Sequence, residues 1–244
     1  MQYNNNSFKI YIIIGEESGE NIIYNILNKL KADTDFKLYG IGGKQLKILG
    51  LNPIFNYSEL SIMGLIEVLP KIPKIYKLIN LVVKDILTIK PNLIISVDAP
   101  DFSFRVLKKV KSKNSEIKNL HIVAPSVWAW KASRAKKISF YLDNLFVLFP
   151  FEKKYFTKYN INTNFIGHPL LDSYKQKKRI FKNKRKLISI FPGSRKKEIN
   201  THLDKILRIL VNYNKVSNFD LVIVAVDKHY DVINKILLKH NINL

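Results

Sequence analysis

The stretch "NLIISVDAPDFSFRV" (92–106) decides the fold, because it predicts a buried strand that runs directly into a helix. The apolar run from Leu93 suits a strand covered on both faces, and it stops at Asp98. Pro100 fixes the turn that follows, and Asp101 is placed to cap the next helix with its side chain. Asp98 is not placed to cap this helix. It is either a partly desolvated general base at the strand's end or one partner of a salt bridge.

The rest of the chain repeats this alternation of strand and helix. Strand-like runs occur at 8–15, 37–43, 92–97, 119–124, 144–149 and 164–167. Amphipathic helical runs separate them, and a long one at 58–90 is interrupted at Pro70 and Pro73. Such alternation with short connections predicts an α/β fold, in which helices cover both faces of a parallel sheet.

A strongly basic segment divides the chain. "KQKKRIFKNKRK" (175–186) has eight Lys or Arg in twelve residues and no acid, so we expect a solvated linker. After it we expect two further strands, at 187–191 and 219–226, and two further helices, at 196–214 and 230–241. We therefore predict two domains, 1–174 and 187–244. Because two strands do not make a stable parallel domain, the second is expected to be incomplete.

Composition limits the function classes. The 244 residues include no cysteine, which excludes disulfides and thiolate metal sites, and the five histidines lack metal-ligand spacing. No apolar run reaches the length of a membrane span, so a cytoplasmic setting is expected. The formal charge of +22 favours polyanionic partners, namely nucleic acid, anionic lipid or phosphorylated substrates. An AT-biased genome, which enriches Lys, Asn and Ile, is the competing explanation for this charge.

Ligands of an open α/β sheet bind beyond the carboxyl ends of its strands, and two segments there have suitable chemistry besides "DAPDF". In "GEESGE" (15–20), Ser18 is placed to cap a helix, and Gly19 would let a ligand approach; an ordinary strand-to-helix turn is the alternative. In "APSVWAW" (124–130), Trp128 suits the wall of a sugar or acyl site and Ser126 a hydrogen-bonding group; aromatic packing at a sheet edge is the alternative.

"FPGSRKKE" (191–198) predicts an anion site in the second domain. Gly193 ends a strand, and Ser194 and Arg195 begin a helix, so free N–H groups and a guanidinium would converge on a phosphate. The spacing is not that of a P-loop. A plain capped helix is the alternative, but three cations in a first helical turn oppose the helix dipole, which favours phosphate binding.

These segments, in this order, resemble the lipid-A-disaccharide synthase family of glycosyltransferases. The similarity is carried by "GEESGE", "GIGG", "SIMGLIEVLPKIPKI", "ISVDAPDF", "PSVWAWKASRAKKI", "LFPFEKKYF", "FIGHPLLD" and "FPGSRKKEI". It implies a GT-B-like architecture of two Rossmann-like domains, with an acceptor-binding first domain and a partial UDP-sugar-binding second one. The family usually has Ala where this chain has Glu17 and Asp where it has Glu20. Its members are also substantially longer, so a fragment or half of a split enzyme is expected.

The resemblance also implies the reaction. A UDP-2,3-diacylglucosamine donor and a 2,3-diacylglucosamine 1-phosphate acceptor would give a β-1,6-linked disaccharide 1-phosphate and UDP, with inversion and without metal or cofactor. The enzyme would lie on the cytoplasmic face of the inner membrane. Asp98 is then the expected base, and Arg195 the cation that stabilises departing UDP. Further substrate contacts are expected from Glu16, Ser18, Gly19, Ser126, Trp128, His168, Gly193 and Ser194. His168 would contact the donor near the domain junction; a hinge residue hydrogen-bonded to the backbone is the alternative.

The acyl chains of such substrates imply contact with a bilayer. We expect it at an apolar surface flanked by lysines, formed by Met63, Leu65, Ile66 and Leu69. A core helix with a basic edge is the alternative. Two other classes stay open for the whole chain. A nucleic-acid-binding protein rests on charge alone, because no RNA or DNA motif is present. A non-catalytic remnant would bind lipid or a partner, either a complementing C-terminal fragment or a second copy.

Overall fold

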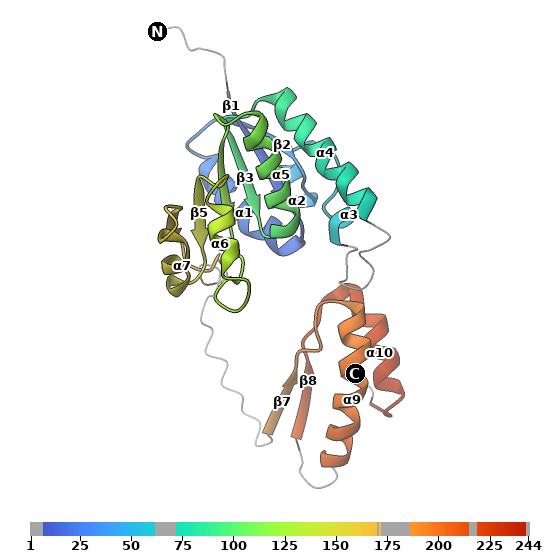
Figure 1. The fold of residues 1–244 in the computed structure, drawn as a ribbon. Helices are drawn as coiled ribbons and strands as arrows, with labels where there is room; N and C mark the ends of the chain where they lie inside the picture. The colour runs from blue at the N-terminus through green and yellow to red at the C-terminus, as the bar shows by residue number, and fades with distance from the viewer. Residues whose placement is uncertain (1–6, 62–71, 170, 172–185, 215–218, 243–244) are drawn as a thin grey trace. The chain divides into compact units, whose positions relative to one another are not determined.

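The computed structural model describes residues 7–61, 72–169, 171, 186–214 and 219–242. The chain divides into two compact units, Met1–Lys175 and Gln176–Leu244, and each is described by itself. Figure 1 shows the course of the chain through them. The expected basic linker lies outside the described residues except for Lys186, with which a strand begins. Met63, Leu65, Ile66 and Leu69 lie outside them as well.

The first unit is built on a fully parallel six-stranded sheet in the order β2-β1-β3-β4-β5-β6. Its strands are β1 (Phe8–Ile14), β2 (Phe36–Gly40), β3 (Leu93–Val97), β4 (Lys118–Ile122), β5 (Asn144–Val147) and β6 (Asn162–Phe165). The parallel sheet predicted from the alternation is thus confirmed. Each predicted strand runs one to three residues beyond the observed one at one end, and those predicted at 37–43, 119–124 and 164–167 also begin one or two residues late.

Helices cover both faces of this sheet (Figure 1). They are α1 (Glu17–Leu30), α2 (Lys44–Ile48), α3 (Ser58–Ser61), α4 (Ile72–Ile89), α5 (Pro100–Lys113), α6 (Ser133–Ile138) and α7 (Lys153–Thr157). One core packs Tyr11 and Ile13 with α4, α5 and α6. The other packs Ile12 and Ile14 with α1 and α2. Successive β1 side chains point to opposite faces, which explains why its apolar run is continuous.

The second unit pairs β7 (Lys186–Ile190) with β8 (Phe219–Ile223) in parallel. Helices α9 (Lys196–Asn214) and α10 (Tyr230–Leu238) bury their apolar stripes in a separate core that includes Ile199, Leu203 and Ile233. The described part of this unit therefore has one βαβ crossover and a helix, as the sequence predicts. No helix in the described ranges has the combination of length and apolar character that a membrane crossing requires.

A buried polar pair lies in the first unit between β3 and β4. The Ser96 hydroxyl is 2.7 Å from Nδ1 of His121, and both side chains are fully buried. Nε2 of His121 has no hydrogen-bond partner among the described residues, and the Phe104 ring packs 4.5 Å away, centroid to centroid. Burial, reinforced by the positive charge of Arg134, lowers the pKa of His121 from 6.5 to about 3. The folded protein therefore keeps this imidazole neutral.

This histidine should make the first unit sensitive to acid. The unfolded chain binds a proton at His121 below pH 6.5 and the folded chain does not, so stability falls as the pH drops from 6.5 towards 3. Between pH 6.5 and pH 5 the loss is about 2 kcal/mol. Urea unfolding followed by tryptophan fluorescence measures this, because both tryptophans lie in this unit. A His121→Gln variant should lose less stability over the same range; an equal loss would contradict the assignment.

Candidate active site

The strand order of the sheet reverses between β1 and β3. The chain leaves β1 for β2 on one side and later returns to place β3 on the other, with Ile14 opposite Val97. The helices that follow β1 and β3, α1 and α5, therefore pack on opposite faces of the sheet. This reversal of strand order is where open α/β sheets bind their ligands. The two segments that meet there are "GEESGE" and "DAPDF", which the sequence singled out separately.

These two loops touch, and glycine makes the contact possible. A Cβ atom on Gly15 would collide with the Cβ of Ala99, and one on Gly19 would lie 3.3 Å from the Val97 carbonyl oxygen. Neither position has room for a larger side chain without movement of the β3 backbone. Gly19 is thus needed for close packing of α1 on β3. This requirement accounts for Gly19 as well as the predicted approach of a ligand does.

Asp98 occupies a strained turn where the loops after β1 and β3 meet. Its φ is 53° and that of Ala99 is 45°, both in the left-handed region, where each non-glycine residue costs of order 1–3 kcal/mol. The surrounding structure holds the turn: Asp98 N–H donates to the Ile122 carbonyl (3.0 Å), and the Ser103 hydroxyl donates to the Asp98 carbonyl (3.1 Å). The carboxylate is partly exposed, and no described residue donates a hydrogen bond to it. The turn thus presents an unengaged carboxylate where the two loops meet.

The predicted caps at Ser18 and Asp101 are wrong. Helix α1 begins at Glu17 with Glu16 as its N-cap, so Ser18 lies inside the first turn and is exposed. The N-cap of α5 is Ala99, which has no capping side chain. Asp101 instead accepts a hydrogen bond from Nη2 of Arg134 at 2.7 Å and ties α5 to α6. Both helices start earlier than expected: α1 follows the extended backbone of Glu16, and α5 follows the left-handed turn at Ala99.

Glu20, a departure from the usual family residue, has a structural role. It is 2% exposed, and its Oε1 accepts hydrogen bonds from the N–H groups of Gly43 (2.8 Å) and Leu46 (3.1 Å). The carboxylate thereby ties α1 to the beginning of α2. Burial, together with the negative charge of Glu20, raises the pKa of Tyr57 to about 12. A single buried glutamate near an active-site loop gives no signal in the sequence that would distinguish it from a ligand contact.

Aromatic side chains gather beyond β4, β5 and β6. The cluster consists of Trp128, Phe151, Phe149 and His168. In that order, the successive ring centroids are 5.4 Å, 5.8 Å and 6.2 Å apart. Trp128, Phe149 and Phe151 are each about half exposed. The structure thus brings together Trp128 and His168, which the sequence singled out, through two phenylalanines that it did not. Ser126 turns the chain into Trp128, its carbonyl accepting from the N–H groups of Ala129 (3.1 Å) and Trp130 (3.3 Å).

In the second unit, a carboxylate occupies the predicted anion site. Oε2 of Glu198 accepts from the N–H groups of Ser194 (3.2 Å) and Arg195 (3.3 Å), and Oε1 pairs with Nη1 of Arg195 (3.2 Å). Gly193 has a φ of 111°, and a Cβ there would meet Glu198. The donors that the sequence predicted for a phosphate therefore converge on one anion as expected, but in this structure the anion belongs to the chain itself.

The architecture is that of the GT-B class, in which Rossmann-like units with parallel sheets bind nucleotide sugars. Among solved structures, a Staphylococcus aureus MnaA–UDP complex matches 97% of this chain and 68% of its own with a TM-score of 0.62 at 16% identity. The UDP-GlcNAc 2-epimerase of Neisseria meningitidis, solved with UDP-GlcNAc, matches 95% of this chain and 70% of its own with a TM-score of 0.58 at 13% identity. At these identities the likeness establishes the fold alone.

The sequence identifies the family within that class. The family model described as lipid-A-disaccharide synthetase matches residues 10–244, so the chain belongs to this family. It is 42% identical over 203 residues to the lipid-A-disaccharide synthase of Rickettsia bellii (strain OSU 85-389), covering 80% of this chain and 53% of that relative. Against the synthase of Rickettsia canadensis it is 36% identical over 241 residues, covering 95% and 63%. The chain thus spans roughly half to two thirds of these relatives' lengths.

Proposed function

We propose that this protein is a glycosyltransferase of lipid A biosynthesis. Its donor would be UDP-2,3-diacylglucosamine and its acceptor 2,3-diacylglucosamine 1-phosphate, and the products a β-1,6-linked disaccharide 1-phosphate and UDP, with inversion. Residues 1–174 would bind the acceptor, and residues 187–244 part of the donor. Family membership supports the reaction class, and the GT-B fold supports a nucleotide-sugar donor.

The observation that carries this proposal is the strained turn at Asp98. Transfer requires the acceptor's 6-hydroxyl to lose a proton as it attacks the anomeric carbon, and a carboxylate is a suitable base. Asp98 is partly exposed where the β1 and β3 loops meet, held in a left-handed turn by β4 and α5, with no donor to its carboxylate among the described residues. Strain of this kind occurs most often at functional sites, and here the turn holds the Asp98 backbone at the carboxyl edge of the sheet.

The aromatic cluster suits the apolar parts of these substrates. It lies beyond strands on the same sheet edge as Asp98, and Trp128, Phe149 and Phe151 keep about half of their surface exposed. Aromatic faces bind sugar rings and acyl chains alike, because both present C–H groups. His168 at the end of the cluster would contact the same substrate.

In the donor half, the Glu198 carboxylate would occupy the site to which the diphosphate binds. Side-chain exposures of 65% for Arg195 and 38% for Glu198 place their ion pair near solvent, where such pairs contribute about 0.2–1 kcal/mol. A diphosphate, with more charge and more acceptor oxygens, would displace the carboxylate from Arg195 and from the N–H groups beyond Gly193. The same groups would then stabilise negative charge on departing UDP.

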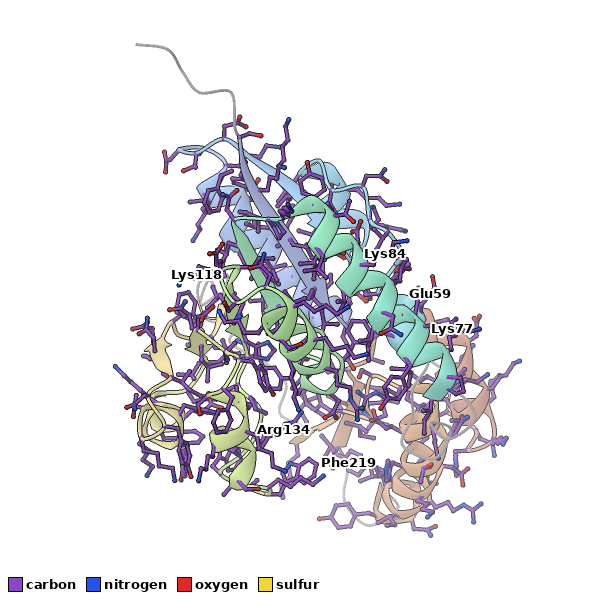
Figure 2. The ribbon with its side chains drawn as sticks, turned by 45° about the horizontal axis from the view of Figure 1, so that its top comes forward. Glu59, Lys77, Lys84, Lys118, Arg134 and Phe219 are labelled. Carbon is purple, nitrogen blue, oxygen red and sulfur yellow. The ribbon has the colours of Figure 1, made fainter. Side chains whose placement is uncertain are left out.

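A membrane surface would supply the acylated substrates, and helix α4 supports contact with it. Lys74, Lys77, Leu81 and Lys84 recur along its exposed side, opposite the buried Ile79 and Val83. Figure 2 labels Lys77 and Lys84 on this helix. A row of lysines next to exposed apolar side chains suits an anionic bilayer. The cytoplasmic face of the inner membrane is the surface we propose.

A second candidate function is binding of lipid or a partner without turnover. It is favoured by the described part of the second unit, whose two strands leave Leu187 43% and Val222 42% exposed. Two-stranded sheets are marginal without further cover, which a complementing fragment or a second copy would provide.

Asp98→Asn should keep the fold and lower the rate of transfer about 10²–10⁴-fold, because an amide cannot accept the hydroxyl proton. Product formation is measured with this chain alone and with the C-terminal half of the Rickettsia bellii synthase added. Asp33→Asn, the same change at an exposed turn, is the control. Equal rates in Asp98→Asn and the parent would remove Asp98 as the base. Absence of transfer under both conditions would favour the non-catalytic candidate.

Arg195→Lys and Glu198→Gln should shift UDP affinity in opposite directions. Lysine replaces a planar fork by a point charge, so we expect about tenfold weaker binding. Glutamine removes the competing charge, so we expect tighter binding. Titration of UDP followed by ³¹P NMR measures both, and thermal melting checks that α9 is intact. Equal affinity in the parent and Arg195→Lys would leave Arg195 without a role in the donor site.

Reversing two charges on α4 should weaken binding to anionic vesicles. Each lysine near such a surface contributes about 1 kcal/mol, so Lys77→Glu/Lys84→Glu should lower the partition constant roughly 20-fold or more. The control Lys113→Glu/Lys118→Glu changes the net charge equally but lies at the amino edge of the sheet. Sedimentation with phosphatidylglycerol vesicles compares the two. Equal losses in both variants would mean that net charge, and not α4, determines binding.

A further inference from the structure

A basic pocket between α5 and α6 has no role in the site described so far. It has a volume of about 290 Å³ and begins at Pro100, two residues after Asp98. Its charged lining consists of Asp101, Arg105, Lys108, Lys131, Arg134 and Lys137. Five cations face one carboxylate, an excess of four positive charges in a space at the small end of ligand pockets.

The Arg134 side chain is held in place within this pocket. Its side chain is 21% exposed, and its guanidinium lies 5.6 Å from the centroid of the Phe104 ring, which itself packs on the buried His121. Figure 2 labels Arg134 on α6. A guanidinium held against an aromatic face loses little freedom when it binds, so its planar fork is organised in advance to bind two oxygens of one anion.

The charge of Arg134 is only partly matched. Its one hydrogen bond to a described residue goes to Asp101, whose side chain is 87% exposed and therefore well screened by water. The remaining N–H donors of the guanidinium stay available for an anion. Tyr141 lines the same pocket, and burial raises its pKa, so its hydroxyl stays protonated and can donate as well.

We propose that this pocket binds a phosphate monoester carried by the acceptor sugar. The assignment rests on the proposed function, because it places the sugar's 1-phosphate beside Arg134 and its 6-hydroxyl at Asp98. Carbons 1 and 5 of a pyranose flank the ring oxygen, so the two groups leave the same edge of the ring and can engage neighbouring sites. The pocket is too small for acyl chains, which would extend towards the exposed aromatic cluster.

Calorimetric titration of the 244-residue chain with glucosamine 1-phosphate tests the pocket without donor or turnover. Inorganic phosphate and vesicles of phosphatidylcholine with phosphatidic acid are the comparison ligands, since each offers a phosphate without the sugar. We expect glucosamine 1-phosphate to bind more tightly than inorganic phosphate. Lys108→Ala/Lys137→Ala should weaken it at least about tenfold, because charge-assisted contacts to phosphate are lost. Arg134→Lys should weaken it as well, since a point charge replaces the fork.

The control Lys113→Ala/Lys118→Ala removes the same charge at the other edge of the sheet and should bind as the parent does. Lys108 and Lys137 are exposed, so their removal keeps the fold, which thermal melting verifies even where Arg134→Lys is unstable. Equal affinity in the pocket variant and the control would overturn the proposal. So would inorganic phosphate or phosphatidic acid vesicles binding as tightly as the sugar phosphate. Loss of transfer in Asp98→Asn with unaltered sugar phosphate binding in the pocket variant would overturn the pocket alone.

Discussion

The close approach of the β1 and β3 loops is the constraint on which the first unit depends. Strand β3 can lie beside β1 only if the turn after β1 has no side chain at Gly15, where a Cβ would meet Ala99. The turn after β3 then changes direction within two consecutive left-handed residues, Asp98 and Ala99. Tight packing of the sheet and the exposure of the Asp98 carboxylate are thus consequences of one geometry. The strain is offset by the hydrogen bonds of this turn to β4 and α5.

The order of strands and helices could be predicted from the sequence because it follows from burial. A strand covered on both faces must be apolar throughout, as in Ile10–Ile14, and a helix packed on it must repeat at 3.6 residues, as in α4. Helix ends are set differently. They depend on one or two backbone angles, which periodicity locates only within a residue or two. The caps predicted at Ser18 and Asp101 failed for this reason, although both helices were placed correctly.

Long-range partners are what the sequence could not supply. Asp101 pairs with Arg134, Glu20 with the N–H groups of Gly43 and Leu46, and Ser96 with His121, each across more than twenty residues. Each acid or histidine, seen alone, has the chemistry of a catalytic group. In the fold, Glu20 and His121 are both buried: the Glu20 carboxylate is bound by N–H groups of the chain, and Nδ1 of His121 pairs with Ser96. Asp98 differs in that its backbone is held tightly while its carboxylate is not, and this contrast supports a chemical role.

The net charge of the chain also could not be assigned to a partner from the sequence. A formal +22 indicates polyanionic partners but does not say which, and composition alone would explain much of it. In the fold the cations separate into groups with different geometry. Those on α4 form an exposed row suited to a flat anionic surface. Those between α5 and α6 line one small, open pocket around an arginine that lies against the Phe104 ring. A solvated surface charge needs no such support, so this pocket, and not the total charge, is the feature that indicates a specific ligand.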